Sequence, residues 1–182
     1  MAKIVGISGL SGSGKTSLIY KLIGILKEKG LTVAVIKHAV SGLKLGGKDT
    51  DKFISRKADC VAGIFGEGIM MYKREQVGLR DLLKKMDNYD IVLIEGFKYE
   101  EFPKIFILKG QGEKDEIEFL KHYKKDILGF AGKKDLNINN TFIKGPMFSY
   151  EGKPYIKYFD KNLPFFDRDD GEKIAEFIIN EI

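Results

Sequence analysis

Eight residues near the start of the chain have the types and spacing of a phosphate-binding loop. The segment Gly9-Leu10-Ser11-Gly12-Ser13-Gly14-Lys15-Thr16 matches the pattern G-x-x-x-x-G-K-[ST] in full. The glycines of such a loop let backbone N–H groups turn toward phosphate oxygens, and the helix that follows adds the positive end of its dipole. Lys15 is expected to reach the β- and γ-phosphates, and the Thr16 hydroxyl to bind Mg²⁺. We therefore predict a nucleoside triphosphate site formed by Gly9, Ser11, Gly12, Ser13, Gly14, Lys15, Thr16 and Ser17.

A phosphate loop of this kind requires an acidic residue near the metal, at the end of a neighbouring strand. Glu95 ends the apolar run 91–94 and is followed by Gly96. A buried strand has no structural reason to end in this way, so Glu95 is expected to hold the metal or to position water. A solvated strand end is the alternative. Lys15 and Glu95 are thus the predicted catalytic residues. Asp49 follows the second predicted strand and is either a further metal ligand or a plain helix N-cap.

A second pattern concerns the base of the nucleotide. Gly132-Lys133-Lys134-Asp135 follows a predicted strand, where GTPases carry [NT]-K-x-D. In that pattern the Asp carboxylate accepts from guanine N1 and N2, and the Lys stem covers the ring. The first position here is Gly132, and lysine-rich turns are common in this chain, so a chance match is the competing interpretation. We predict that Lys133 and Asp135 bind guanine.

Strands and helices alternate along most of the chain, and these elements must position the residues above. Apolar runs predict strands at residues 3–8, 31–37, 59–65, 69–73, 90–95, 104–108 and 127–131, and 3.6-residue periodicity predicts helices at 15–29, 49–57, 78–86, 113–123 and 169–182. This alternation indicates a mostly parallel sheet covered on both faces, and hence a three-layer α/β fold of the P-loop NTPase type. Residues 141–148 and 153–159 predict an antiparallel β-hairpin before the last helix. We expect one nucleotide-binding domain over residues 1–182, with this hairpin as an insertion at about 141–159.

Composition excludes several classes of protein. The chain has 31 Lys and Arg against 26 Asp and Glu, a net charge of +5, but only 4 of the basic residues are Arg. Lysines spread over the whole chain favour a solvated surface over a nucleic-acid interface. No apolar run approaches the roughly 18 residues of a membrane span, and the first residues do not resemble a secretory signal. With a single Cys and no disulfide framework, a cytoplasmic protein without nucleic-acid or membrane partners is expected.

Basic residues also gather in and beside the loop after the second predicted strand. Lys37 and His38 end that strand, and Lys48 lies further along the loop. Because this loop is expected near the phosphates, it could hold a second anionic ligand. A solvated basic loop is the alternative.

Several short segments occur in a fixed order after the phosphate loop. They are Val35-Ile36-Lys37-His38, Gly47-Lys48-Asp49-Thr50, Arg56-Lys57-Ala58-Asp59, Glu95-Gly96-Phe97-Lys98 and Pro103-Lys104-Ile105. Together they resemble the molybdopterin-guanine dinucleotide biosynthesis protein B (MobB) family. Leu163-Pro164-Phe165-Phe166-Asp167, before the last helix, is similar too.

The resemblance implies a GTP-binding, slowly GTP-hydrolysing protein that is often dimeric. Such a protein assists a partner nucleotidyltransferase that attaches GMP to molybdopterin. GTP and Mg²⁺ are then the implied cofactors, and molybdopterin is a further candidate ligand. Carried over to this sequence, Glu95 is the acidic strand end, and Lys37, His38, Lys48 and Asp49 match the loop after the second strand. The further histidines that the family often has after Lys-His are replaced here by Ala39, Val40 and Ser41.

Three other functions share the phosphate loop. A small-molecule kinase usually closes an arginine-bearing lid over the phosphoryl group, whereas the four Arg residues here are scattered. A metal-inserting GTPase needs a relay of soft ligands, for which one Cys and two distant His are a poor set. A nucleotide-dependent adaptor without significant catalysis is the third. Phosphoryl transfer to an added metabolite would separate a kinase from a slow GTPase whose hydrolysis responds to a protein partner.

Overall fold

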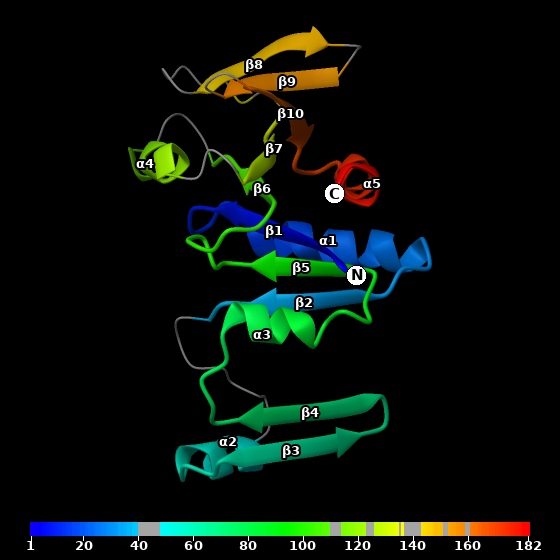
Figure 1. Ribbon diagram of the computed structural model, residues 1–182, viewed down its shortest axis with the longest axis vertical. Coiled ribbons are helices and arrows are strands. Elements are labelled where there is room, and N and C mark those ends of the chain that lie inside the picture. The colour runs from blue at the N-terminus through cyan, green and yellow to red at the C-terminus, as the bar shows by residue number, and fades with distance from the viewer. Residues whose placement is uncertain are drawn as a thin grey trace. The chain divides into compact units, whose positions relative to one another are not determined.

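The computed structural model describes residues 1–39, 48–109, 114–122, 126–134, 136, 143–150, 153–158 and 161–182 (Figure 1). The chain forms two compact units. One consists of residues 1–38 and 86–182, and the other of residues 39–85. Whether these two units fold together as one domain, as the sequence analysis predicts, does not follow from their compactness. The single domain over residues 1–182 therefore stays a prediction.

An eight-stranded sheet forms the centre of the first unit, with the order β2-β5-β1-β6-β7-β10-β9-β8 in the part of the chain that the structure describes. The strands are β1 (Lys3–Gly9), β2 (Val33–Lys37), β5 (Ile91–Glu95), β6 (Lys104–Ile107), β7 (Ile127–Gly132), β8 (Ile143–Tyr150), β9 (Lys153–Tyr158) and β10 (Lys161–Asp167). Every neighbouring pair from β2 to β10 is parallel, and β10, β9 and β8 are joined antiparallel. The predicted mostly parallel sheet and the C-terminal hairpin are therefore confirmed.

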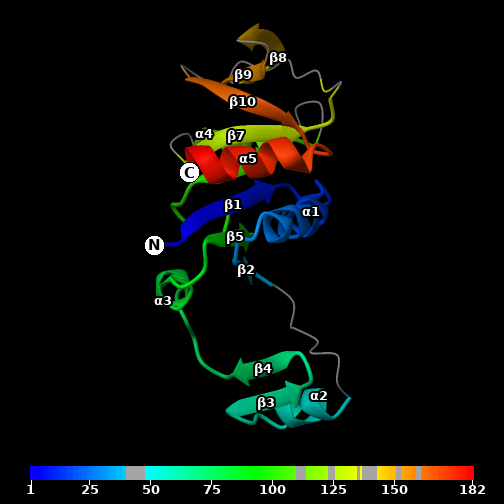
Figure 2. The same ribbon diagram turned by 90° about the vertical axis from the view of Figure 1, so that its right-hand side faces the viewer.

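Helices cover both faces of the central part of this sheet, which explains why β5 and β6 are buried along almost their whole length. On β6, Ile105 and Ile107 belong to one core with residues of α1 (Lys15–Glu28) and α5 (Gly171–Glu181). Phe106, between them, belongs to a second core with Leu120 of α4 (Lys114–His122). Because successive strand residues point to opposite faces, α1 and α5 lie on one face and α4 on the other. Figures 1 and 2 show α1 and α5 next to each other.

The approach of α1 to α5 is close at one point. A Cβ atom at Gly171 would lie 2.8 Å from Ile25 Cδ1, so a larger residue there requires the end of the Ile25 side chain to move. Ion pairs flank the contact, because Lys21 lies 3.0 Å from Asp169 and Lys29 lies 3.2 Å from Glu172. The segment that leads from β10 into α5 is thereby held along the length of α1.

The sequence analysis did not predict β10. Pro164 argues against a strand because it lacks an N–H group for the ladder. In the structure Pro164 pairs with Tyr155 of β9, whereas the parallel pairing with β7 starts one residue later, at Phe165. The proline thus lies where β10 changes partners. The strand carries the following residue, Arg168, to the edge where β7 ends.

The second unit contains α2 (Lys48–Ser55), the antiparallel hairpin of β3 (Cys60–Phe65) and β4 (Gly68–Lys73), and α3 (Leu79–Lys84). The Arg74 guanidinium closes the end of α2 with a 2.7 Å hydrogen bond to the Ile54 carbonyl. One hairpin face is apolar and exposed in the single chain: Ile64 is 88% exposed, Ile69 72% and Met71 55%. Within the described ranges, every helix is too short or too polar to cross a lipid bilayer.

Candidate functional site

The phosphate-binding loop joins β1 to α1 and uses a backbone that requires glycine. Gly12 has φ 73° and Gly14 has φ 96°, both in the left-handed region. The Ser13 N–H donates a 3.2 Å hydrogen bond to the Leu10 carbonyl and closes the loop on itself. At Gly9 a Cβ atom would lie 2.7 Å from the Ile107 carbonyl oxygen, so β6 can lie against the start of the loop only because this residue has no side chain.

The first turn of α1 has the electrostatics of an anion-binding site. Gly14 occupies the N-cap position, and among the described residues no side chain caps the helix and no acidic residue lies in its first turn. The N–H groups at the start of the helix are therefore left without a capping side chain. Phosphate groups are the ligands that such a helix start favours.

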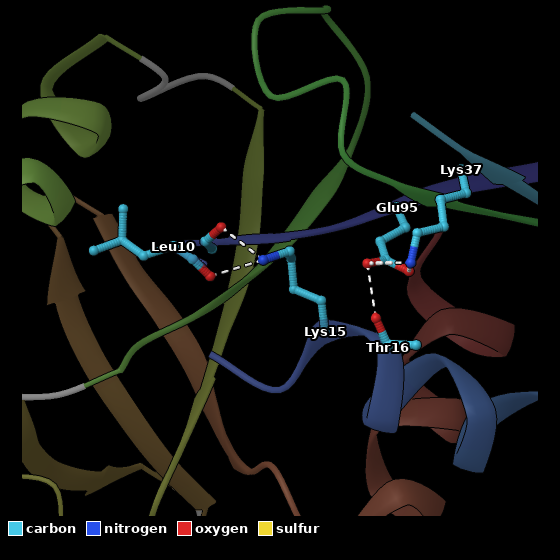
Figure 3. A network of polar contacts seen from close by, with 6 residues as sticks. Leu10, Lys15, Thr16, Lys37 and Glu95 are labelled. Carbon is cyan, nitrogen blue, oxygen red and sulfur yellow. Dashed lines mark hydrogen bonds and ion pairs between the residues drawn. The ribbon is translucent and has the colours of Figure 1, made fainter. Parts of the chain in front are cut away.

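The Lys15 ammonium rests on the backbone of the same loop. It donates hydrogen bonds of 3.1 Å to the Gly9 carbonyl and 2.7 Å to the Leu10 carbonyl (Figure 3). Burial lowers the pKa of Lys15, with Glu95 opposing this shift and Lys37 adding to it. A lysine held in this way can exchange two neutral carbonyls for phosphate oxygens.

Glu95 lies at the end of β5, between the ends of β1 and β2. Its Oε1 accepts a 2.8 Å hydrogen bond from the Thr16 hydroxyl. The Lys37 ammonium lies 3.2 Å from Oε1 and 3.1 Å from Oε2. Figure 3 shows Thr16 and Lys37 reaching the carboxylate from different sides. The Glu95 side chain is only 12% exposed, so these two groups provide much of its polar environment.

The hydroxyl of Thr16 and the carboxylate of Glu95 suit one kind of metal. Both are hard oxygen donors, and Mg²⁺ is commonly held by one or two protein oxygens together with waters and substrate phosphates. No group of three or more His, Cys, Asp and Glu side chains that could hold a metal occurs among the described residues. The pair therefore fits Mg²⁺ that arrives with a phosphate ligand.

Asp49 and Lys48 belong to the second unit. Asp49 lies in the first turn of α2, where it pairs with Lys52 at 3.1 Å, and Lys48 begins the same helix. Their assignments, Asp49 to the metal and Lys48 to an anionic ligand, stay predictions.

His38 follows Lys37 but has a different partner. Its backbone N–H donates a 2.9 Å hydrogen bond to the Glu95 carbonyl, and its ring lies 4.8 Å from the Phe97 ring, centroid to centroid. Between them Gly96 has φ 91°, and a Cβ there would lie 2.9 Å from His38 Cβ. His38 thus packs on the turn after Glu95.

Arg168 is a residue of this region that the sequence analysis missed. Its backbone N–H donates a 2.9 Å hydrogen bond to the Gly132 carbonyl, and its guanidinium lies 3.5 Å from the Ser13 carbonyl of the phosphate loop. One residue thus contacts the phosphate loop and the start of the predicted guanine loop. Lys133 is exposed, and Asp135 lies outside the described residues. The sequence contains one signal that could have indicated this role: Arg168 is one of only four arginines in the chain. Without a predicted strand before it, its position in the fold could not be inferred.

Comparison with known proteins identifies the family. Residues 4–133 match the family described as Molybdopterin guanine dinucleotide synthesis protein B, MobB. The chain belongs to the MobB family. A Haemophilus influenzae relative, the molybdopterin-guanine dinucleotide biosynthesis adapter protein, is 32% identical over 146 residues, which cover 77% of this chain and 80% of the relative. The Escherichia coli protein of the same name is 31% identical over 125 residues, covering 64% of this chain and 71% of the relative.

Solved structures support the same assignment. The crystal structure of Bacillus subtilis MobB superposes with a TM-score of 0.69 at 26% identity, and the match covers 99% of this chain and 98% of that one. The family resemblance and the P-loop type of α/β fold are thereby confirmed. Since the structural match runs through the whole chain, β10 and the Arg168 region lie within the part compared with the MobB fold.

Proposed function

We propose that this MobB-family chain is an accessory protein in the synthesis of the molybdopterin guanine dinucleotide cofactor, and that it binds and slowly hydrolyses GTP with Mg²⁺. The names of the relatives support the place in cofactor synthesis. One observation carries the nucleotide part of the proposal. The Thr16 hydroxyl in the first turn of α1 and the Glu95 carboxylate at the end of β5 are joined by a 2.8 Å hydrogen bond beside an uncapped helix start.

Each group has a role in binding the triphosphate. The loop N–H groups and the start of α1 bind phosphate oxygens. Lys15 leaves the Gly9 and Leu10 carbonyls and pairs with the β- and γ-phosphates. Thr16 and Glu95 would hold Mg²⁺, which would supply positive charge beside the phosphates.

Guanine is the proposed base because of the Gly132–Asp135 pattern. Lys133 and Asp135 would cover and bind it. The 2.9 Å bond from the Arg168 N–H to the Gly132 carbonyl supports this assignment, because it holds the start of the loop where the pattern lacks its usual Asn or Thr. A carboxylate that accepts two donors from guanine contributes about 1.5–3 kcal/mol, which corresponds to roughly ten- to a hundredfold preference over adenine.

The partners are proposed as well. This chain would assist a nucleotidyltransferase of the same pathway, and the adapter names of the relatives support this.

A homodimer would cover the exposed hairpin face of Ile64, Ile69 and Met71. Molybdopterin carries a phosphate, and a hollow of about 450 Å³ in the second unit, lined in part by Arg56 and Lys57, is the basic surface that we propose for it.

Calorimetry with GTP and ATP, with and without Mg²⁺, tests the proposal. We expect GTP to bind more tightly than ATP, Mg²⁺ to strengthen binding, and Lys15→Ala to weaken it without lowering the melting temperature. Equal binding by the Lys15→Ala variant would refute the site. Phosphoryl transfer to an added metabolite would favour the kinase alternative.

A further inference from the structure

We infer that the Lys37 ammonium competes with a divalent metal ion for the Glu95 carboxylate. As a consequence, the metal binds together with the nucleotide and not before it. The inference rests on the proposed function for the metal site at Thr16 and Glu95 and for the ligand that releases Lys37. Its central test uses a metal ion alone and is therefore independent of whether the chain binds GTP.

The geometry places Lys37 on both carboxylate oxygens. In the β2–β5 pairing Lys37 is directly opposite Glu95. Its Nζ lies 3.2 Å from Oε1 and 3.1 Å from Oε2, and Oε1 also accepts the Thr16 hydrogen bond. The two oxygens that would face a metal therefore already have partners. A divalent ion has to displace this ammonium or share the carboxylate with it.

It is energetically unfavourable for the Lys37 ammonium and a divalent ion to share the Glu95 carboxylate. The Glu95 side chain is only 12% exposed, and charges that are partly buried are screened less than charges in free solution. An ammonium and a divalent cation on one such carboxylate therefore repel each other strongly. Displacement is easier for Lys37, whose side chain is 52% exposed and can return its charge to water. In the absence of phosphate, Lys37 thus lowers the affinity of the site for metal.

A triphosphate removes this obstacle because it brings anionic oxygens to the loop. Lys15 and Lys37 both rest on internal acceptors, the first on the Gly9 and Leu10 carbonyls and the second on Glu95. Phosphate oxygens offer both lysines stronger partners. Once Lys37 turns to a phosphate, Glu95 is free for the metal. The result is a positive coupling between nucleotide and metal, which must hold in both directions.

The test compares Mn²⁺ binding, followed by electron paramagnetic resonance without nucleotide, in the parent protein and in Lys37→Met. Removing the competing cation should tighten Mn²⁺ binding by about tenfold or more. Glu95→Gln in the same background should abolish the gain. Lys29→Met is a matched control, because it removes an equal charge and breaks a 3.2 Å ion pair, with Glu172, elsewhere in the same unit. It should bind Mn²⁺ like the parent.

Unchanged or weaker Mn²⁺ binding by a folded Lys37→Met variant overturns the inference. Lys37→Gln provides a second uncharged variant, and loss of the fold in both would identify the ion pair as purely structural and overturn the inference as well. GTP binding measured on the same proteins separates the two proposals. If the parent does not bind GTP, the proposed function fails while the Mn²⁺ comparison still decides the role of Lys37.

Discussion

The Thr16 hydroxyl donates a 2.8 Å hydrogen bond to Glu95, a residue 79 positions further along the chain. The bond joins the first turn of α1 to the end of β5, two elements that the parallel sheet brings to one edge. Both oxygens are thus in place before a ligand binds, and little further ordering of these side chains is needed when it does.

The Glu95→Gln substitution should lower GTP hydrolysis more than GTP affinity. The amide keeps an oxygen for the Thr16 hydroxyl, but the charge that helps to hold Mg²⁺ is lost, and the metal matters most as charge shifts in the transition state. We expect single-turnover hydrolysis to fall by roughly 100-fold, the order found when one charge-stabilising group is removed, and calorimetric affinity to change much less. Parent-like hydrolysis would return Glu95 to a structural role.

The Arg168→Ala substitution should weaken GTP binding by roughly tenfold, an amount typical of a lost hydrogen bond that involves a charged group. The guanidinium lies 3.5 Å from the Ser13 carbonyl and supports the phosphate loop from β10. Arg168→Lys keeps the charge without the planar fork, so an intermediate affinity is expected. Arg80→Ala, at an exposed position of α3, is the control. Equal GTP affinities of Arg168→Ala and the parent would contradict this role.

The Gly6→Ala substitution should destabilise the fold by about 1–3 kcal/mol through overpacking. A Cβ atom at Gly6 would lie 2.2 Å from Phe102 Cε2, so the Phe102 ring must move. That ring lies beside the buried Lys104 ammonium, 4.1 Å from the ring centroid. Urea unfolding of Gly6→Ala, Phe102→Leu and the double variant should reveal a non-additive cost, since the smaller side chain relieves the clash. If the two single variants lowered the free energy of unfolding additively, the clash with the Phe102 ring would not be the cause of the destabilisation.

Acid should remove a stabilising contact at Asp90. Its Oδ2 accepts hydrogen bonds from the Thr32 N–H at 2.8 Å and the Thr32 hydroxyl at 2.7 Å, and these bonds lower the pKa of Asp90 below its usual 3.8. Because the folded state favours the ionised form, the contribution is complete well above pH 3.8 and is lost as the pH falls through the lowered value.

The Asp90→Ala variant should therefore melt at a lower temperature than the parent at neutral pH, and the difference should shrink in acid. Melting curves over this pH range test the expectation. Asp87→Ala, at a nearby exposed position, is the matched control. A difference between Asp90→Ala and the parent that stays constant with pH would mean that ionised Asp90 is not the stabilising group.

The Ile64→Lys substitution should dissociate the proposed homodimer. Ile64 is 88% exposed in the single chain and pairs across the hairpin with Ile69. A charge at the centre of a buried apolar contact is costly, so sedimentation equilibrium should reveal a monomer. Tyr20→Lys, at an 80% exposed position of α1, should stay dimeric. A parent protein that is monomeric at all concentrations would refute the dimer itself.

The elements nearest the phosphate loop could be predicted because their signals are local. The loop pattern is contiguous, and β5 is an apolar run that ends in Glu95. The boundaries differ by one or two residues, as for α1, which ends at Glu28 rather than at residue 29. Whether each of these elements is a helix or a strand, and the order in which they occur along the chain, follows from the periodicity of the apolar residues.

The contacts that distinguish this site depend on long-range pairing. The partner of Lys37 follows from the β2–β5 register, which no local pattern contains. Arg168 reaches the phosphate loop only because β10 joins β7 despite Pro164. Lys104 is fully buried, although hydropathy would place a lysine at the surface. It is held by Asp126 at 3.6 Å and by the Phe102 carbonyl at 3.1 Å.

The central place of β1 in the sheet also affects the order of events during synthesis. Residues 3–9 leave the ribosome first, but their two neighbours in the sheet are β5 and β6, which end at residues 95 and 107. The phosphate loop therefore has no completed sheet beneath it until more than half of the chain has been made. Pairings between such distant segments are slow to form. We expect nascent chains arrested before β6 to bind no nucleotide, because the proposed GTP site would form only late in folding.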